Sequence, residues 1–163
     1  MTESGTELLL LQQQAAALGA ILSDVIATRL GIGSTDLKCL FLLLREPRTP
    51  RELAAGLHLP PSTITSVLDR LERAGFARRA PSPTDRRRVL VSAVPERAAE
   101  AIAHYEPLFA EMAAVLARYD DAQLATLRDF AQRSVEVLQS RLAAENVAEK
   151  VPRNQGRDRV DPA

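Results

Sequence analysis

The order of predicted elements between residues 34 and 94 constrains the fold more than any other feature of this 163-residue chain. Apolar residues at helical spacing predict three short helices in succession, the last covering about residues 61–74. Two short strands are predicted directly after them, at 76–80 and 88–94, with a proline-containing turn between the strands. This order predicts a mainly α fold with one small β-hairpin.

Sequence signals mark where these helices begin and end. Thr49-Pro50-Arg51-Glu52 combines a hydroxyl cap, a proline in the first turn and a glutamate three residues after the cap, so it predicts a helix start. We expect Ser34 to cap the preceding helix, and Ser4, which has capping-box spacing to Glu7, to cap an N-terminal helix. Gly75 stands where a helix commonly ends on a left-handed residue.

The helix predicted at 61–74 has two distinct faces. Projection at about 100° per residue gathers its large apolar residues on one side, which we expect to face the core: Ile64, Val67, Leu68 and Leu71. The opposite side carries small hydroxyl and charged side chains: Ser62, Thr65, Ser66, Asp69 and Arg73. Such a face can enter a major groove without clashing and can bond base edges or phosphates. The free amides at the helix N-terminus also favour phosphate binding.

Positive charge gathers on the same segment although the whole chain is neutral. The chain has 21 basic and 21 acidic residues, whereas residues 69–88 contain seven arginines and three acids, a net charge of +4. Prolines stiffen the tip of the predicted hairpin at 81–85, and Arg86 and Arg87 at this tip can reach into a minor groove. The alternative is a merely solvated hairpin. The coincidence of charge, stiff tip and small-residue helix favours DNA binding.

Apolar helices are predicted on both sides of this segment. The N-terminal helix should end near the break at Gly31-Ile32-Gly33, Pro95 opens a long helix, and Asp120 with Gln123 marks the start of another. Residues after about 145 include almost no large apolar side chains, so we expect them to be disordered. The predicted division is an N-terminal helical part, a central domain with the hairpin, C-terminal helices and a tail: 1–33, 34–94, 95–144 and 145–163.

The composition indicates a soluble cytoplasmic protein. One cysteine, Cys39, allows no intramolecular disulfide. The apolar start at Leu8–Leu11 does not resemble a signal peptide, because acidic residues precede it and glutamines follow it. We expect no stretch long and apolar enough to span a bilayer, and therefore no membrane association. Arginine supplies 19 of the 21 basic residues, which suits phosphate contacts but is equally explained by a GC-rich coding sequence.

No residue pattern indicates an enzyme, a metal or a cofactor. Two histidines and one cysteine cannot build a convincing zinc site, and no catalytic triad, paired carboxylates or glycine-rich phosphate loop is visible. Cys39 is either a redox sensor or, as we favour, a buried small apolar residue. His104 and Tyr105 could line an effector cavity, although packing or exposure is favoured, and His58 is expected at the surface.

Four stretches of the central segment resemble the MarR (multiple antibiotic resistance regulator) family of winged helix-turn-helix transcriptional regulators. They are Thr49-Pro50-Arg51-Glu52-Leu53-Ala54, Pro61-Ser62-Thr63-Ile64-Thr65, Leu68-Asp69-Arg70-Leu71-Glu72-Arg73-Ala74-Gly75 and Pro83-Thr84-Asp85-Arg86-Arg87-Arg88. The resemblance covers about residues 8–144 and is most specific over 61–88. It implies a winged helix-turn-helix with N- and C-terminal dimerisation helices, in which the helix starting near Ser62 is the recognition helix.

The resemblance also implies a mode of action. A homodimer would present two recognition helices to successive major grooves of a pseudo-palindromic operator in double-stranded DNA. Aromatic or phenolic acids would bind between the dimerisation helices and the winged domain and release a repressor. Asp85 would stabilise the wing, and these residues would contact DNA: Ser62, Thr63, Thr65, Ser66, Arg70, Arg73, Arg86, Arg87 and Arg88.

The chain departs from the family pattern at three places. Pro60 stands where a cap hydroxyl is common, Ser66 stands where an arginine is common, and the wing strand ends in Ala93-Val94 instead of an apolar residue and threonine. The serine weakens direct readout by the recognition helix, so the wing arginines would carry more of the affinity. The alternative function is a winged-helix protein–protein interaction module without specific DNA readout.

Overall fold

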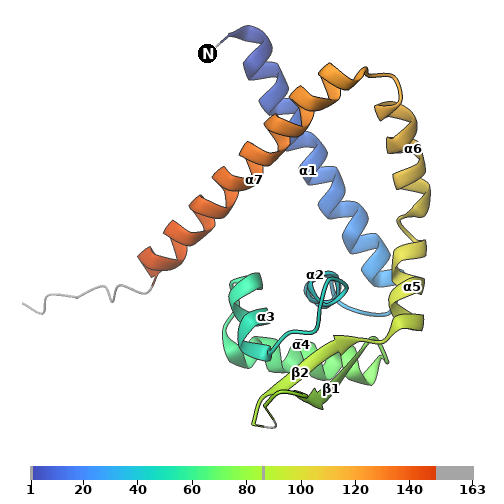
Figure 1. Cartoon of the computed structure of the whole chain (residues 1–163), viewed down its shortest axis with the longest axis vertical. Helices are drawn as coiled ribbons and strands as arrows, with labels where there is room; N and C mark the ends of the chain where they lie inside the picture. The colour runs from blue at the N-terminus through green and yellow to red at the C-terminus, as the bar shows by residue number, and fades with distance from the viewer. Residues whose placement is uncertain (1, 86, 150–163) are drawn as a thin grey trace, which may run out of the picture. The chain divides into compact units, whose positions relative to one another are not determined.

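The computed structural model describes residues 2–85 and 87–149, and the side chains of 2–85 and 87–145. The chain forms two compact units, Met1–Ala110 and Glu111–Ala163. The first unit holds α1 (Glu3–Arg29), α2 (Ser34–Leu43), α3 (Pro50–Leu57), α4 (Pro61–Arg73), β1 (Ala77–Pro81), β2 (Val89–Ala93) and α5 (Pro95–Ala103) (Figure 1). Helix α6 (Glu106–Leu116) crosses the division, and α7 (Asp121–Glu149) lies in the second unit. The predicted mainly α fold with one hairpin is confirmed.

The core of the first unit lies between α1, α2, α3 and α4. The last turns of α1 contribute Ile26, and α2 contributes Leu37 and Leu40. From α4 come the four apolar residues predicted to share one face, and all four are fully buried: Ile64, Val67, Leu68 and Leu71. The predicted register of α4 is therefore correct, and its opposite face is left at the surface.

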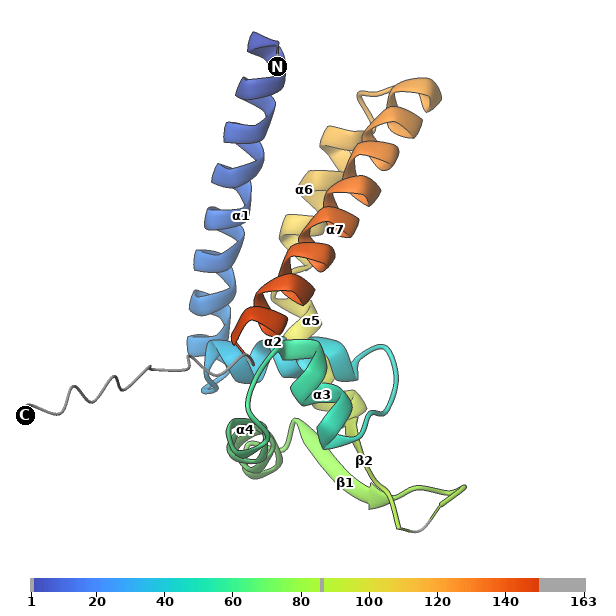
Figure 2. The same cartoon turned by 90° about the vertical axis from the view of Figure 1, so that its left-hand side faces the viewer.

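A glycine turn joins α4 directly to the hairpin. Gly75 is left-handed (φ +77°), and the N–H groups of Phe76 and Gly75 donate to the carbonyls of Leu71 (2.8 Å) and Glu72 (3.0 Å). This double closure satisfies the last carbonyls of the helix, and β1 begins two residues after the glycine. Figure 2 shows the hairpin projecting beyond α3 and α4.

The two strands of the hairpin are antiparallel, with Arg79 opposite Val91 and Pro81 opposite Val89. Arg48 extends this sheet on the other edge of β2, because its N–H donates to the Val91 carbonyl (2.9 Å) and its carbonyl accepts from the Val91 N–H (2.8 Å). Val91 itself is buried in the core. The base of the hairpin is thus tied to the segment before α3, and only its tip projects.

Of the caps predicted at Thr49, Ser34 and Ser4, the first is confirmed and the other two are wrong. Thr49 Oγ1 accepts from the Glu52 N–H (3.2 Å) while the Glu52 carboxylate accepts from the Thr49 N–H (2.8 Å), as predicted. Helix α1 is capped by Thr2 instead of Ser4. Helix α2 is capped at Gly33 instead of Ser34, because the Asp36 carboxylate accepts the Gly33 N–H and moves the start one residue earlier.

The helix predicted to run unbroken from Pro95 is two helices. Turns at His104 and Tyr105 separate α5 from α6. Pro107 explains the break, because proline has no N–H to donate to the Ala103 carbonyl and its ring clashes with that carbonyl. The reciprocal cap of Asp120 and Gln123 before α7 is confirmed, with N–H to side-chain distances of 2.8 and 3.0 Å. Helix α7 continues to Glu149, past the predicted boundary at 144, and 150–163 of the predicted tail lie outside the described residues.

Helix α1 corrects the expectation that no stretch could span a bilayer. It has 27 residues and an 18-residue window with a mean hydropathy of 1.3, which is long and apolar enough by length and composition. Within α1 only Ile26 and Ala27 are buried. Its exposed large apolar residues include four in succession, which cover every side of the helix: Leu8, Leu9, Leu10 and Leu11. Apolar surface of this extent needs a covering partner.

Candidate nucleic-acid interface

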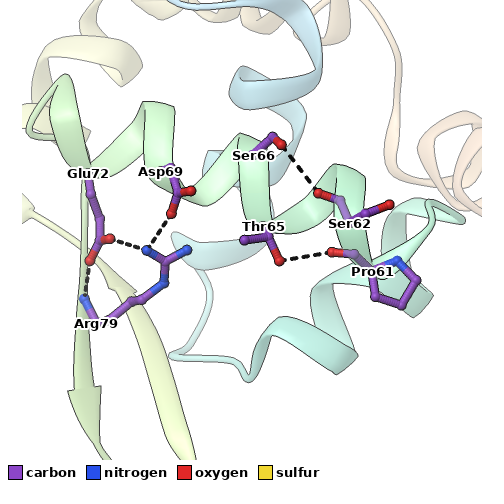
Figure 3. Close-up of polar contacts among 7 residues, drawn as sticks. All are labelled: Pro61, Ser62, Thr65, Ser66, Asp69, Glu72 and Arg79. Atoms are coloured by element: carbon purple, nitrogen blue, oxygen red, sulfur yellow. Dashed lines mark hydrogen bonds and ion pairs between the residues drawn. The ribbon is translucent and has the colours of Figure 1, made fainter.

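The outer face of α4 carries hydroxyl side chains in the order predicted. Ser62, Thr63, Thr65, Ser66 and Arg73 are all exposed. Thr65 Oγ1 donates to the Pro61 carbonyl (3.0 Å) and Ser66 Oγ donates to the Ser62 carbonyl (3.3 Å) (Figure 3). These bonds keep both side chains close to the helix, so the face is low and polar and can approach another surface closely.

Arg79 on β1 joins the hairpin to this face of α4. Its guanidinium forms ion pairs with Asp69 (2.8 Å) and with Glu72, and the Glu72 carboxylate also accepts the Arg79 N–H (2.8 Å) (Figure 3). Sequence reasoning placed Asp69 on the outer face but missed this clamp. The spacing of Asp69 and Glu72, three residues apart on a helix, was the available signal for a shared cation. The single positive charge of Arg79 offsets one of these two negative charges, which would otherwise both repel phosphate.

Arg70, which the sequence assigned to DNA contact, has a carboxylate partner within the protein. Its Nε lies 3.1 and 3.0 Å from the two carboxylate oxygens of Asp36, and its Nη2 lies 2.6 Å from Oδ1. Asp36 is fully buried in α2. The hydrogen bonds to this carboxylate raise the pKa of Arg70 above its ordinary value. The guanidinium of Arg70 is therefore oriented toward α2.

Asp85 shapes the tip of the wing, which is the turn between β1 and β2. Its carboxylate accepts the Arg87 N–H (3.0 Å) and its carbonyl accepts the Arg88 N–H (2.9 Å), while the Arg88 carbonyl accepts the Ser82 N–H (2.8 Å). An aspartate that bonds the backbone two residues on favours a tight turn. The Arg87 side chain is exposed at this tip, and Arg86 lies outside the described residues.

Arg88 contacts α3, on the other side of the wing. Its guanidinium lies 3.2 Å from the Glu52 carboxylate, and both side chains are about half exposed. The hydrogen bonds that Glu52 accepts from Thr49, together with the nearby arginine charges, lower the pKa of the Glu52 carboxyl below its ordinary value. The pair contributes little to stability at such exposure, but it gives Arg88 a competing acidic partner.

Among the described residues of this surface, three arginines carry positive charge that no acid of the protein pairs with. Arg70, Arg79 and Arg88 have acidic partners within the protein. Among the described residues of 69–88, Arg73, Arg78 and Arg87 form no ion pair, although Arg78 Nε donates to Ser92 Oγ (3.3 Å). The predicted set of contact residues is therefore only partly free, and Arg78 is a free cation that the prediction left out.

Other residues that the sequence singled out are structural in their surroundings. Cys39 is fully buried, and burial followed by the nearby Asp36 charge raises the pKa of its thiol to about 12. Tyr105 is buried, with its ring 5.3 Å from Phe41 and its hydroxyl donating to Ser23 Oγ (3.0 Å). His58 is exposed in a left-handed conformation at the end of α3. In the described part of the chain, no group of three or more His, Cys, Asp or Glu could hold a metal ion.

Comparisons with known proteins agree with this architecture. Residues 30–88 match the sequence model of the MarR family. The HTH-type transcriptional regulator YcgE of Bacillus subtilis (strain 168) is 28% identical over 117 residues, 71% of this chain and 76% of that protein. The crystal structure of RV1404 from Mycobacterium tuberculosis has a TM-score of 0.61 at 24% identity, over 82% of this chain and 96% of that chain. The crystal structure of wild-type MarR from E. coli in its apo form has a TM-score of 0.56 at 24% identity, over 82% of this chain and 97% of that chain.

The two structures share the fold of this chain, and the family match spans α2, α3, α4, β1 and the wing tip. This is the part in which the hydroxyl face of α4 lies beside the arginine-bearing hairpin. The winged helix-turn-helix segment is therefore the part of this chain that is similar to the MarR family.

Proposed function

We propose that the chain is a transcriptional regulator that binds a pseudo-palindromic operator in double-stranded DNA as a homodimer. The observation that carries the proposal is that the exposed hydroxyl face of α4 is joined through Arg79 to the same hairpin whose tip presents Arg87. The helix face fits a major groove, and the tip arginine fits the adjacent minor groove or its phosphates. Such a regulator acts in the cytoplasm.

Exposed apolar surface supports the homodimer. Most large apolar residues of α1 are exposed within the first unit, and in the second unit Val135, Leu138 and Leu142 of α7 are also about half exposed or more. Apolar stripes at this spacing are normally covered by another helix. A second copy covers them symmetrically and sets two copies of α4 at a fixed separation. A membrane is the competing cover for α1.

The division of labour between helix and wing follows from charge. Ser66 stands where relatives of this family commonly have arginine, so α4 contributes small polar contacts and the wing contributes most of the charge. Arg87 forms no ion pair with any described residue of the protein, and Asp85 holds its backbone in the tip. Its full charge is available for DNA.

Replacing Arg87 with alanine tests this assignment. We expect Arg87→Ala to weaken operator binding on the order of 10- to 100-fold and to lower the slope of log affinity against log salt by ~1, because one phosphate or groove contact is lost. The dimer should remain intact in sedimentation. Arg133→Ala, which removes an exposed arginine from α7, is the matched control and should bind like the parent. Parental affinity of Arg87→Ala would show the wing assignment to be wrong.

Selection of bound duplexes from a random pool, followed by sequencing, tests the whole proposal. A two-fold repeat with half-sites about one helical turn apart is the expected result. The alternative, a protein–protein interaction module, is favoured only by Ser66 in place of arginine. It predicts no enriched repeat and no linear dependence of log affinity on log salt.

We further propose that the regulator is a repressor released by an aromatic or phenolic acid. A ligand that binds the DNA-competent and DNA-incompetent dimers equally shifts nothing, so the acid must favour recognition helices at the wrong separation. Calorimetric titration of candidate acids should give binding, and the same acids should lower operator affinity. Absence of both effects removes ligand control from the proposal without affecting DNA binding.

A further inference from the structure

The Asp36 carboxylate connects the turn between α1 and α2 with the recognition helix α4. It accepts the N–H of Gly33 (3.0 Å) at the start of α2, and it accepts three short contacts from the Arg70 guanidinium. The turn itself is permissive, because Gly31 is left-handed (φ +70°) and no atom lies within 4 Å of the position its Cβ would take. The turn also has backbone hydrogen bonds to the end of α1, from the Gly31 N–H to the Thr28 carbonyl (3.1 Å) and from the Ile32 N–H to the Ala27 carbonyl (3.0 Å), and the carboxylate adds a bond from α2.

Both buried apolar residues and the ion pair hold α4 at this end. A shallow pocket of about 320 Å³ lies beside the ion pair, lined by Gly33, Asp36, Arg70, Arg73 and neighbouring residues of the turn and of α4. The Arg70 side chain is 46% exposed, whereas Asp36 is 0% exposed. The guanidinium–carboxylate fork is geometrically specific, so beside the buried Leu68 and Leu71 it adds a directed contact that orients the C-terminal half of α4 relative to α2.

We propose that Asp36 and Arg70 are positioning residues that set the angle between α1 and α4 and thereby the half-site spacing that the dimer accepts. This inference rests on the proposed function, because the role of α1 in a homodimer is itself part of that proposal. Helix α1 ends in the same core as α2, so a change at the Asp36 joint rotates α4 relative to α1. One base pair of spacing displaces a half-site by about 3.4 Å along the duplex. A dimer without the Asp36–Arg70 contact would therefore accept several spacings.

The inference changes the role of Arg70. As a DNA-contacting residue, Arg70 would release counterions, and its loss would lower the salt slope by ~1 and weaken all operators alike. If Arg70 is a positioning residue, its loss leaves the salt slope unchanged and lowers the affinity for the operator of preferred spacing more than the affinity for the others. The two roles are therefore separated by measurements on the same set of operators.

The experiment uses the selected operator and two versions with the central spacer one base pair longer or shorter. We expect the parent to prefer the selected spacer by about ten-fold or more, and Asp36→Asn and Arg70→Gln to reduce that preference to about three-fold or less with an unchanged salt slope. Arg70→Lys keeps the charge but loses the fork, so its preference should lie between those of the parent and Arg70→Gln. Circular dichroism under the binding conditions shows which variants are folded.

Two controls keep the result specific. Leu43→Ala removes a buried side chain of α2 without touching the ion pair, so it lowers stability but should retain the spacing preference. Arg87→Ala should weaken the three operators equally. If Asp36→Asn does not fold, Arg70→Lys decides, because it leaves a cation beside the buried carboxylate. A parent that selects no operator contradicts the proposed function, whereas variants that keep a ten-fold spacing preference contradict only this inference.

Discussion

At the scale of single residues, two kinds of contact hold α4: apolar side chains buried on one side, and the ion pair of Arg70 with Asp36. The burial of Ile64 and Leu68 follows from periodicity, because 3.6 residues per turn bring apolar residues to one side. The pairing of Arg70 with Asp36, 34 residues earlier, depends on how two helices pack, and no local pattern contains it. From the sequence alone, Arg70 is therefore predicted to contact DNA, because it lies on a basic segment.

Cys39 illustrates a prediction at this scale. Burial raises the pKa of its thiol to about 12, above the ordinary value of 9.0. Because the folded state holds this proton more tightly, the protonated thiol contributes to the unfolding free energy. This contribution is fully present below pH 9 and is lost as the pH rises from about 9 to 12. Urea unfolding at a series of pH values should show this loss in the parent and a smaller loss in Cys39→Ala.

The same burial predicts indifference to oxidants. The reactive form of cysteine is the thiolate, which a raised pKa suppresses at neutral pH. Treatment of the folded parent with hydrogen peroxide should leave operator affinity unchanged, and a thiol reagent should label Cys39 only after unfolding. Loss of DNA binding on mild peroxide treatment, restored by a reductant, would support the redox-sensor interpretation instead.

At the scale of elements, capping and proline chemistry account for both the successes and the errors. The start of α3 at Thr49 is fully encoded in four consecutive residues, and Gly75 encodes the end of α4. The start of α2 is displaced because Asp36, and not the hydroxyl of Ser34, bonds a free N–H. Pro107 is the sequence signal for the break before α6. The apolar spacing on both sides of it nevertheless predicts one unbroken helix.

Two of the hydroxyls predicted as caps, Thr49 and Ser34, give a matched pair of substitutions. Thr49→Ala should cost about 1 kcal/mol of unfolding free energy, because the Glu52 N–H loses the Thr49 hydroxyl that caps it, although the backbone N–H of residue 49 can still donate to the Glu52 carboxylate. Ser34→Ala should change the unfolding free energy by less than about 0.5 kcal/mol, since this serine lies inside the first turn of α2. Equal losses in the two variants, measured by urea unfolding, would restore Ser34 as the cap.

At the scale of the whole molecule, each unit exposes apolar helix surface that the rest of that unit does not cover. Composition alone pointed to a soluble protein, and the apolar stripes predicted helices, but neither specified what lies against α1 and α7. A homodimer, as proposed, removes this surface from water, and its stability then depends on protomer concentration.

Leu138→Asp tests this association. A carboxylate placed in an apolar contact loses hydration without gaining a partner, so sedimentation should show mostly monomer, and operator binding should fall together with dimerisation. Gln139→Asp adds the same charge at the neighbouring exposed position of α7 and should remain dimeric. The thermal midpoint of the parent should rise with protein concentration, and a midpoint independent of concentration would contradict an obligate dimer.

The back-bonded hydroxyls of Thr65 and Ser66 have a consequence for which bases α4 can recognise. Each hydroxyl gives its only hydrogen to a carbonyl of its own helix, which leaves lone pairs for an outside partner. In a major groove, lone pairs match the exocyclic amino groups of adenine and cytosine, whereas guanine and thymine offer oxygen and ring nitrogen acceptors there. If these intrahelical bonds persist on the duplex, adenine or cytosine should stand beneath the two positions, and guanine should be read by an arginine.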